Sequence, residues 1–360
     1  MLKNGNNRKY RKKLWRDRRS RKILRKMSTR NSKKDKRGYR GGYRSRQRKQ
    51  SKLSSVTIPR NFSLTENAQE TIKCFDSIEK KLRISDGGDT LKLDFSEVEN
   101  LSIDAIMYLI AFMQNQNKQG YSKHIRGNYP RNEKAKSDMI SSGFLDFVKT
   151  PMVFDEEELK KEDTLMITVG DLVKEDVLAE VCRFVNRAFD TSKKYTRFIY
   201  TIIGELMANT NEHAYTDTRE AKKVVNRWYL FVKNIDNKRI QFTLLDTGLG
   251  IPITINKRRL EKFRDSIPPL KASDSTYIFE ALQGKHKSIA RSRTKEENRN
   301  KGLPAIYDCY EQGKIKQFKI FSNHGVYYST DELSQPQDLE RKLKGTLFYW
   351  EIEKNAESEE

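Results

Sequence analysis

The sequence predicts an α/β (α+β) protein with two folded domains behind a basic tail. Three observations lead to this prediction. The chain of 360 residues has room for two domains of ordinary size, its Lys and Arg are concentrated at the N-terminus, and strand-like stretches alternate with helix-like ones along the rest. We expect the tail at 1–53, a first domain at 54–150, a linker at 151–163 and a second domain at 164–360.

The tail accounts for most of the net charge of +23. Residues 1–50 hold 23 Lys or Arg and two acidic residues, which leaves 49 basic and 47 acidic residues for the rest of the chain. A segment with so few apolar side chains cannot offset its chain entropy, so we expect disorder. Its Arg residues, with Tyr39 and Tyr43, suit contact with phosphates and unpaired bases of a nucleic acid. A merely solubilising tail is the alternative.

Cysteine and apolar content indicate a cytoplasmic protein. Cys74, Cys182 and Cys309 are far apart and form no C-x-x-C spacing, so we expect reduced thiols. No run approaches the roughly 18 apolar residues that a membrane span requires. The N-terminus also lacks the apolar region of a secretory signal.

The first domain is expected to alternate strands with helices. Leu91, Leu93 and Phe95 alternate with polar residues as in a strand, Ser102 is suited to an N-cap, and Gly143 to a helix end. The expected elements are a strand at 57–64, a helix from Thr65 to about Leu82, a strand at 91–95, a helix after Ser102, a strand near Ile125 and a helix from about Glu133 to Gly143.

One part of this domain resembles a known family. The stretch L-K-L-D-F-S-E-V-E-N-L-S-I-D-A-I-M-Y-L, followed by G-N-Y-P-R-N and S-S-G-F-L-D-F, is similar to a STAS domain of the anti-sigma antagonist type. In that family a regulatory serine opens the helix, but the matching position here holds Asp104. An acidic side chain there also complements the helix dipole. The resemblance implies a protein-interaction domain without catalytic residues.

The second domain is expected to contain helices and a sheet. Its expected elements are a strand at 164–169, helices at 176–188 and 194–214, a hairpin of strands at 228–232 and 240–245, a helix from Ser273 or Asp274 to Gly284, a helix at 303–310, a strand at 315–321 and a closing strand at 344–352. We interpret the residues after Pro252 as a hydrophilic connection and 329–342 as a polar insertion.

A polar stripe marks the expected helix at 194–214. Glu205, Asn209 and His213 recur every four residues, which places them on one face beside an apolar stripe. A carboxylate, an amide and an imidazole in a row could serve as a base, a metal ligand and a phosphate neighbour. The alternative is an ordinary amphipathic helix with a solvated polar face.

A glycine-rich turn follows the strand at 240–245. The carboxylate of Asp246 could accept a hydrogen bond from the exocyclic amine of adenine, and Gly248 and Gly250 would let the backbone approach a ring or a phosphate. Farther on, the expected helix at Gly302 could direct N–H groups at a phosphate. The basic stretch before it suits a lid over phosphates.

Four motifs stand in order: E-L-M-A-N-T-N-E-H, D-T-G-L-G-I, N-K-G-L-P-A-I and K-G-T-L-F. This order resembles the GHKL ATPase superfamily, which includes gyrase, heat-shock chaperone, histidine-kinase and MutL ATP-binding domains. The resemblance runs from Lys194 to the end of the chain. It implies a two-layer α/β sandwich with a mixed sheet, which binds ATP and Mg²⁺.

The resemblance also implies residue roles. Glu205 matches the residue that polarises the attacking water, and Asn209 matches the Mg²⁺ ligand, an oxygen donor suited to that ion. Pro304 stands where the family usually has another glycine and donates no N–H, which bears on turnover more than on binding. The remaining implied nucleotide contacts are His213 near the phosphates, Asp246 at adenine, Gly248 and Gly250 in the first glycine-rich motif, Lys301 and Gly302 in the second, and Gly345 and Thr346 in the last.

Three function classes remain open. The first is a switch in which the second domain binds and slowly hydrolyses ATP and acts together with the STAS-like domain. Such a switch would act on a protein partner or as a homodimer. The second is a protein serine/threonine kinase of the anti-sigma type, and the third is a non-catalytic nucleotide-sensing or nucleic-acid-binding adaptor. A sensor histidine kinase is disfavoured, because the only histidine before the first motif is His124, in an expected loop.

Overall fold

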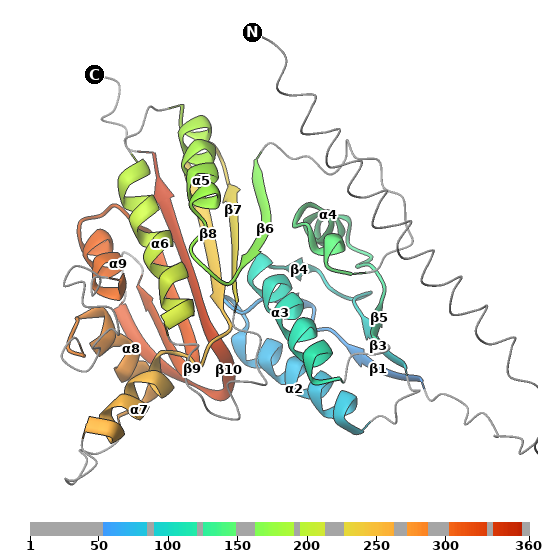
Figure 1. Ribbon diagram of the computed structural model, residues 1–360. Helices are drawn as coiled ribbons and strands as arrows, with labels where there is room; N and C mark the ends of the chain where they lie inside the picture. The colour runs from blue at the N-terminus through green and yellow to red at the C-terminus, as the bar shows by residue number, and fades with distance from the viewer. Residues whose placement is uncertain are drawn as a thin grey trace, which may run out of the picture. The chain divides into compact units, whose positions relative to one another are not determined.

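A computed structural model describes residues 53–84, 90–120, 125–148, 163–190, 195–212, 227–262, 272–286, 302–329 and 334–354. These residues belong to one compact unit, Ser51–Glu360. The expected tail, except for Leu53, and almost all of the linker lie outside the described residues. The fold class is α/β, with a parallel α/β part at the N-terminal end and an antiparallel sheet at the C-terminal end (Figure 1).

In the described residues of the N-terminal part, the strands form two small parallel sheets. One has the strand order β1-β3-β5, and the other pairs β2 with β4. Its elements are β1 (Leu53–Thr57), β2 (Asn61–Phe62), α2 (Ala68–Ile84), β3 (Thr90–Asp94), β4 (Asn100–Leu101), α3 (Ile103–Gln119), β5 (Ile125–Gly127), α4 (Glu133–Ser141) and the short 3-10 helix η1 (Phe144–Asp146). The expected single strand at 57–64 is interrupted, because the chain leaves β1 at Thr57 and pairs again only in β2, at Asn61–Phe62.

The start of α3 is organised by a buried carboxylate. Asp104 is 1% exposed and accepts hydrogen bonds from the Leu64 N–H at 2.8 Å and from the Thr65 hydroxyl at 2.7 Å. The Ser102 hydroxyl also donates to Asp104 instead of capping the helix. Asp104 thus complements the helix dipole, as expected, and ties the segment before α2 to the beginning of α3.

The described residues of the C-terminal part form a five-stranded sheet of order β6-β7-β8-β10-β9, with five helices. Its elements are β6 (Thr164–Gly170), α5 (Glu175–Ala188), α6 (Thr196–Glu212), β7 (Trp228–Asn234), β8 (Arg239–Asp246), α7 (Ile251–Lys262), α8 (Asp274–Leu282), α9 (Gly302–Glu311), β9 (Lys316–Ser329) and β10 (Ser334–Glu353). All neighbouring strands are antiparallel. The expected mixed sheet is therefore wrong, because β7 and β8 form one hairpin, β9 and β10 form another, and the hairpins join through antiparallel β8 and β10.

Two further expectations fail in this part. The connection after Pro252 begins with α7, whose Ile251 and Ile255 pack against α8 although charged residues dominate the stretch. The expected polar insertion at 329–342 is mostly strand, since β10 starts at Ser334 and pairs with the end of β9. Residues 334–338 pair with 325–329 despite their hydrophilic composition, and Leu339, which follows them, is buried.

The antiparallel sheet is buried on both faces. In β7, Trp228, Leu230 and Val232 pack against α5, α6 and α9, whereas Tyr229 and Phe231 belong to a core shared with α2 and α3. Figure 1 shows the two groups of helices on opposite sides of the sheet. A continuous apolar strand is typical of a sheet with two covered faces.

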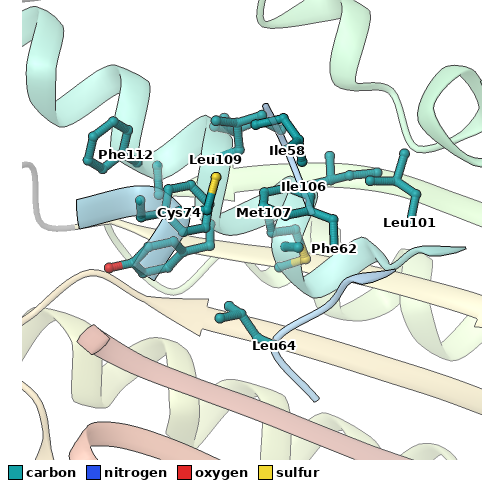
Figure 2. Close-up of a cluster of buried hydrophobic side chains, with 14 of the residues drawn as sticks. Ile58, Phe62, Leu64, Cys74, Leu101, Ile106, Met107, Leu109 and Phe112 are labelled. Atoms are coloured by element: carbon teal, nitrogen blue, oxygen red, sulfur yellow. The ribbon is translucent and has the colours of Figure 1, made fainter. Parts of the chain in front are cut away.

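The core shared with the N-terminal part joins residues that are far apart in the chain. Figure 2 shows side chains from α2, α3 and the segment around β2 gathered together, among them Cys74, Ile106 and Phe62. Burial raises the pKa of the Cys74 thiol to about 12, so this cysteine serves as a core residue. All three cysteines lie in the described residues and form no disulfide. Within the described ranges, no helix has the length and apolar character to cross a membrane.

This shared core predicts that the C-terminal part does not fold well alone. A fragment starting at residue 163 would expose Tyr229, Phe231 and Leu347, each 3% exposed or less in the whole chain. We expect it to aggregate or to unfold without cooperativity, as judged by light scattering and urea titration. The matched control is a chain starting at residue 51. A monomeric fragment with a sharp unfolding transition would contradict the prediction.

Candidate functional site

Helix α6 presents the first two residues of the polar stripe. Ile199, Ile202 and Ile203 are at most 2% exposed and fix the helix on the sheet, as the apolar stripe predicts. Glu205 and Asn209 are partly exposed beside this face. The third residue of the stripe, His213, lies outside the described residues. Among the described side chains of this stripe, α6 therefore places one carboxylate and one amide on the same helix face.

The start of α9 lies directly against these two side chains. A Cβ atom added to Gly302 would come within 2.9 Å of Asn209 Nδ2 and 3.5 Å of Glu205 Oε2. Any larger residue at position 302 would have to displace the amide. Glycine thus permits the first turn of α9 to approach α6. This approach brings together two motifs that are distant in sequence. Lys301, the neighbour of Gly302, lies outside the described residues.

Asp246 ends β8 on the same side of the sheet as α6. Its carboxylate accepts a hydrogen bond from the Gly248 N–H at 2.9 Å. Burial raises the pKa of Asp246 to about 6, although hydrogen bonds from Gly248 and from the Thr210 hydroxyl act in the opposite direction. Thr210 follows Asn209 on α6. The Thr210 hydroxyl therefore links the expected ligand residues of α6 to Asp246.

Glycines in the turn after Asp246 and in the facing part of β10 are required by the backbone there. Gly250 has φ +90, and a Cβ atom there would lie 2.6 Å from Asn323 Nδ2. Gly345 has φ +97, and a Cβ atom there would lie 2.1 Å from the Asp246 carbonyl oxygen. Only glycine combines this backbone conformation with so close an approach. A Cβ atom on Gly248 would meet the Asp246 carboxylate at 3.2 Å.

Thr346 pairs with Asp246 across β8 and β10. It is 2% exposed, and its hydroxyl forms a hydrogen bond with the Ser322 hydroxyl at 2.9 Å. The structure therefore brings eight predicted residues to one end of the sheet, although they come from four motifs. They are Glu205 and Asn209 on α6, Asp246, Gly248 and Gly250 at the end of β8, Gly302 on α9, and Gly345 and Thr346 on β10.

Sequence reasoning missed three residues that shape this region. Thr210 bonds to Asp246, and Ser322 and Asn323 bond to the turn after it. Asn323 has φ 55, a left-handed conformation that asparagine tolerates better than most residues. The signal in the sequence was S-N-H-G after an apolar strand, which resembles an ordinary turn when its partners are unknown.

The donor set fits a hard cation held mainly by a phosphate ligand. Among the described residues, no cluster of three or more His, Cys, Asp and Glu could form a metal cage. Mg²⁺ commonly takes one or two protein oxygens and completes its shell with water and phosphate oxygens. Asn209 could supply such an oxygen, and the N–H groups at the start of α9 suit an anion. The carboxylate of Asp246 suits an amine donor.

Comparison of the chain with family models, with curated proteins and with solved structures found no match. Function is therefore inferred from the residues of α6, β8, α9 and β10 and from their contacts. These elements supply the carboxylates, the amide and the glycines described above.

The raised pKa of Asp246 predicts that this residue costs stability. In the folded state it ionises near pH 6, against 3.8 for an ordinary aspartate, so its cost is absent below pH 3.8, grows up to pH 6 and is complete above pH 6. We expect Asp246→Asn to stabilise the protein by about 1–3 kcal/mol above pH 6, at ~1.4 kcal/mol per pKa unit. Urea unfolding from pH 4 to pH 8 measures this difference.

Asp94 is the matched control for this titration. Hydrogen bonds from Ser96, then from Asn128, hold the pKa of Asp94 well below its ordinary value. Asp94 thus contributes stability that is present above pH 3.8 and is lost as the pH falls toward its folded pKa. Asp94→Asn should therefore destabilise the protein at pH 7. Equal, pH-independent effects of the two substitutions would contradict the assignment.

Proposed function

We propose that this protein binds Mg-ATP at the end of its antiparallel sheet, in the manner of the GHKL superfamily that its motifs resemble. The observation that carries the proposal is the contact of Gly302 with Asn209 and Glu205. It supports a site in which the start of one helix and the polar stripe of another face the same ligand. Asn209 would give an oxygen to Mg²⁺, and the N–H groups of α9 would bind phosphate.

Asp246 would bind the adenine end of the nucleotide. Above pH 6 its carboxylate is ionised, and it accepts from an exocyclic amine more strongly than a neutral group does. Gly248 and Gly250 leave the neighbouring backbone without side chains. An amine that donates to Asp246 would also offset part of its burial cost, which favours ligand binding over an empty site.

Glu205 would act as the base if the nucleotide is hydrolysed. Its Oε2 atom would lie 3.5 Å from a Cβ atom on Gly302, so it stands beside the phosphate-binding turn of α9. From there it could take a proton from a water that attacks the terminal phosphate. Pro304 lies in the first turn of α9 and offers no N–H to a phosphate, which suits slow turnover.

The N-terminal part would sense the nucleotide through α3. The Gln114 side-chain oxygen accepts hydrogen bonds from Arg227 at 3.0 Å and from the Tyr229 hydroxyl at 2.8 Å. The Tyr108 hydroxyl accepts from the Lys344 N–H at 3.1 Å. In the sheet, Asp246 lies between Trp228 of β7 and Thr346 of β10. Arg227 and Tyr229 flank Trp228 in the chain, and Lys344 lies two residues before Thr346. Such contacts support a switch in which the STAS-like part and the ligand affect each other.

The other two function classes differ in what they require. A kinase would need a serine or threonine acceptor in a partner, because the position matching the regulatory serine holds Asp104, which is 1% exposed. A non-catalytic nucleotide sensor is favoured by Pro304, which removes one phosphate donor. Nucleic-acid contact by residues 1–50, which lie outside the described residues, stays a prediction from composition.

Substitutions on α6 separate binding from turnover. We expect Asn209→Ala to weaken Mg-ATP binding about tenfold or more, or ~1.4 kcal/mol, with a smaller effect in the absence of Mg²⁺. Glu205→Ala should retain binding and lower phosphate release by roughly 10²–10⁴-fold. Calorimetry and a phosphate-release assay measure the two effects. Glu180→Ala, at an exposed position of α5, is the matched control. A wild-type protein that fails to bind ATP would overturn the proposal.

The contact of α3 with β7 predicts coupling over a distance. Gln114→Ala removes the acceptor for both Arg227 and Tyr229, so we expect a change of about 5-fold or more in ATP affinity, a typical allosteric coupling. By reciprocity, ATP should alter amide exchange in α3 of the wild type. Gln119→Ala, at an exposed position of the same helix, should leave affinity unchanged. Identical affinities for the two variants would contradict coupling.

A further inference from the structure

Two adjacent residues of β9 anchor the turn that follows Asp246. We propose that Ser322 and Asn323 are positioning residues of the nucleotide site, which hold the turn at 247–253 against β10. This inference rests on the proposed function, because it concerns the same ligand. Both residues are buried, with 0% and 1% exposure, so water cannot replace the hydrogen bonds that they make.

Asn323 caps α7 from outside the helix. Its Oδ1 atom accepts a hydrogen bond from the Ile253 N–H at 3.3 Å, and its Nδ2 atom donates to the Leu249 carbonyl at 3.0 Å. The first N–H groups of a helix have no partner within it and are usually capped by the residue just before it. Gly250 precedes α7 and has no side chain, so a residue of another strand supplies the cap.

Ser322 ties the same turn to the last motif. Its hydroxyl oxygen accepts from the Ile251 N–H at 2.9 Å, and its O–H donates to the Gly345 carbonyl at 3.2 Å. It also lies 2.9 Å from the Thr346 hydroxyl, which can donate to it. One hydroxyl thereby uses its donor and both acceptor positions. The turn after Asp246 and the K-G-T segment are therefore held together by one buried side chain.

An irregularity of β9 permits this arrangement. Successive side chains of a regular strand point to opposite faces, yet Ser322 and Asn323 both reach the same turn. The pairing of β9 with β10 shifts register between Leu343 and Thr346, and Asn323 adopts φ 55 at this point. A bulge commonly redirects a side chain next to a functional site. The close approach of Gly250 to Asn323 leaves the turn no room to shift.

The anchored turn carries the residues assigned to adenine. Gly248 donates to the Asp246 carboxylate from within it, so motion of the turn would disturb that carboxylate. If the turn were free before binding, the ligand would have to order it, and the apparent affinity would fall. Ser322 and Asn323 therefore act on the ligand through the turn and do not contact it.

The test uses full-length protein, with Asn323→Gly as the main variant. Glycine retains the left-handed backbone and removes both side-chain hydrogen bonds. We expect ATP affinity, measured by calorimetry with Mg²⁺, to fall about tenfold or more, or ~1.4 kcal/mol. Amide exchange at Ile251 and Ile253 should accelerate in the absence of any ligand. Asn323→Asp retains the acceptor for Ile253 and should restore part of the affinity.

Asn234→Ala is the control for a general loss of stability. Asn234 is a buried amide at the end of β7, 7% exposed, that bonds to Asn237 and Asp163 away from this turn. It should lower the unfolding temperature and leave ATP affinity unchanged. If Asn323→Gly does not fold, Asn323→Asp and Ser322→Ala carry the test, each with an expected loss of severalfold in affinity.

The outcomes are distinguishable. If wild type binds ATP and the variants at 322 and 323 bind equally well, this inference fails and the proposed function stands. The inference also fails if Asn234→Ala loses as much affinity as Asn323→Gly, because the effect would then be general destabilisation. If wild type does not bind ATP, the proposed function fails and this inference fails with it.

Discussion

Burial of the antiparallel sheet on both faces is the constraint on which the rest of the structure depends. Helices α5, α6 and α9 cover one face, and α2 and α3 cover the other, so that β7 and β8 lie in the middle of the molecule. Side chains on these faces are committed to the core. Functional groups must therefore stand at the ends of the strands, and the end of β8 is where Asp246, α6 and α9 meet.

The same burial makes the candidate site costly. Asp246 loses hydration that two hydrogen bonds do not fully replace, which raises its pKa. Asp94 has the opposite balance, since donors from Ser96 and Asn128 favour its ionised form. A carboxylate that lowers stability is typical of functional positions, where activity is retained at the expense of stability. The contrast within one chain supports a ligand-binding role for Asp246 and a structural role for Asp94.

Local pattern predicted most elements, and eight of the residues that it singled out lie together at one end of the sheet. The four-residue spacing of Glu205 and Asn209 placed both on one helix face, and the D-T-G-L-G turn was expected at the end of β8, where it lies. The mixed sheet, the hydrophilic connection in place of α7 and the polar insertion in place of the first half of β10 were wrong, because strand direction and helix and strand packing depend on partners distant in sequence. Ser322 and Asn323 were missed for the same reason. Their role is defined by a bulge and by bonds to a turn some seventy residues earlier.

The contacts around Asp246 suggest why the N-terminal part belongs to the same unit. Its two neighbours in the sheet are Trp228 and Thr346. Helix α3 forms hydrogen bonds with Arg227, next to Trp228, and with Lys344, near Thr346. Lys344 also forms an ion pair with Glu79 of α2 at 2.8 Å. On the opposite side, Ser322 fixes the turn to Gly345. Asp246 is thus held between two sets of contacts that meet at residues 344–346. A ligand that moved this carboxylate would have to strain one set or the other, so the N-terminal part would respond to binding without touching the ligand.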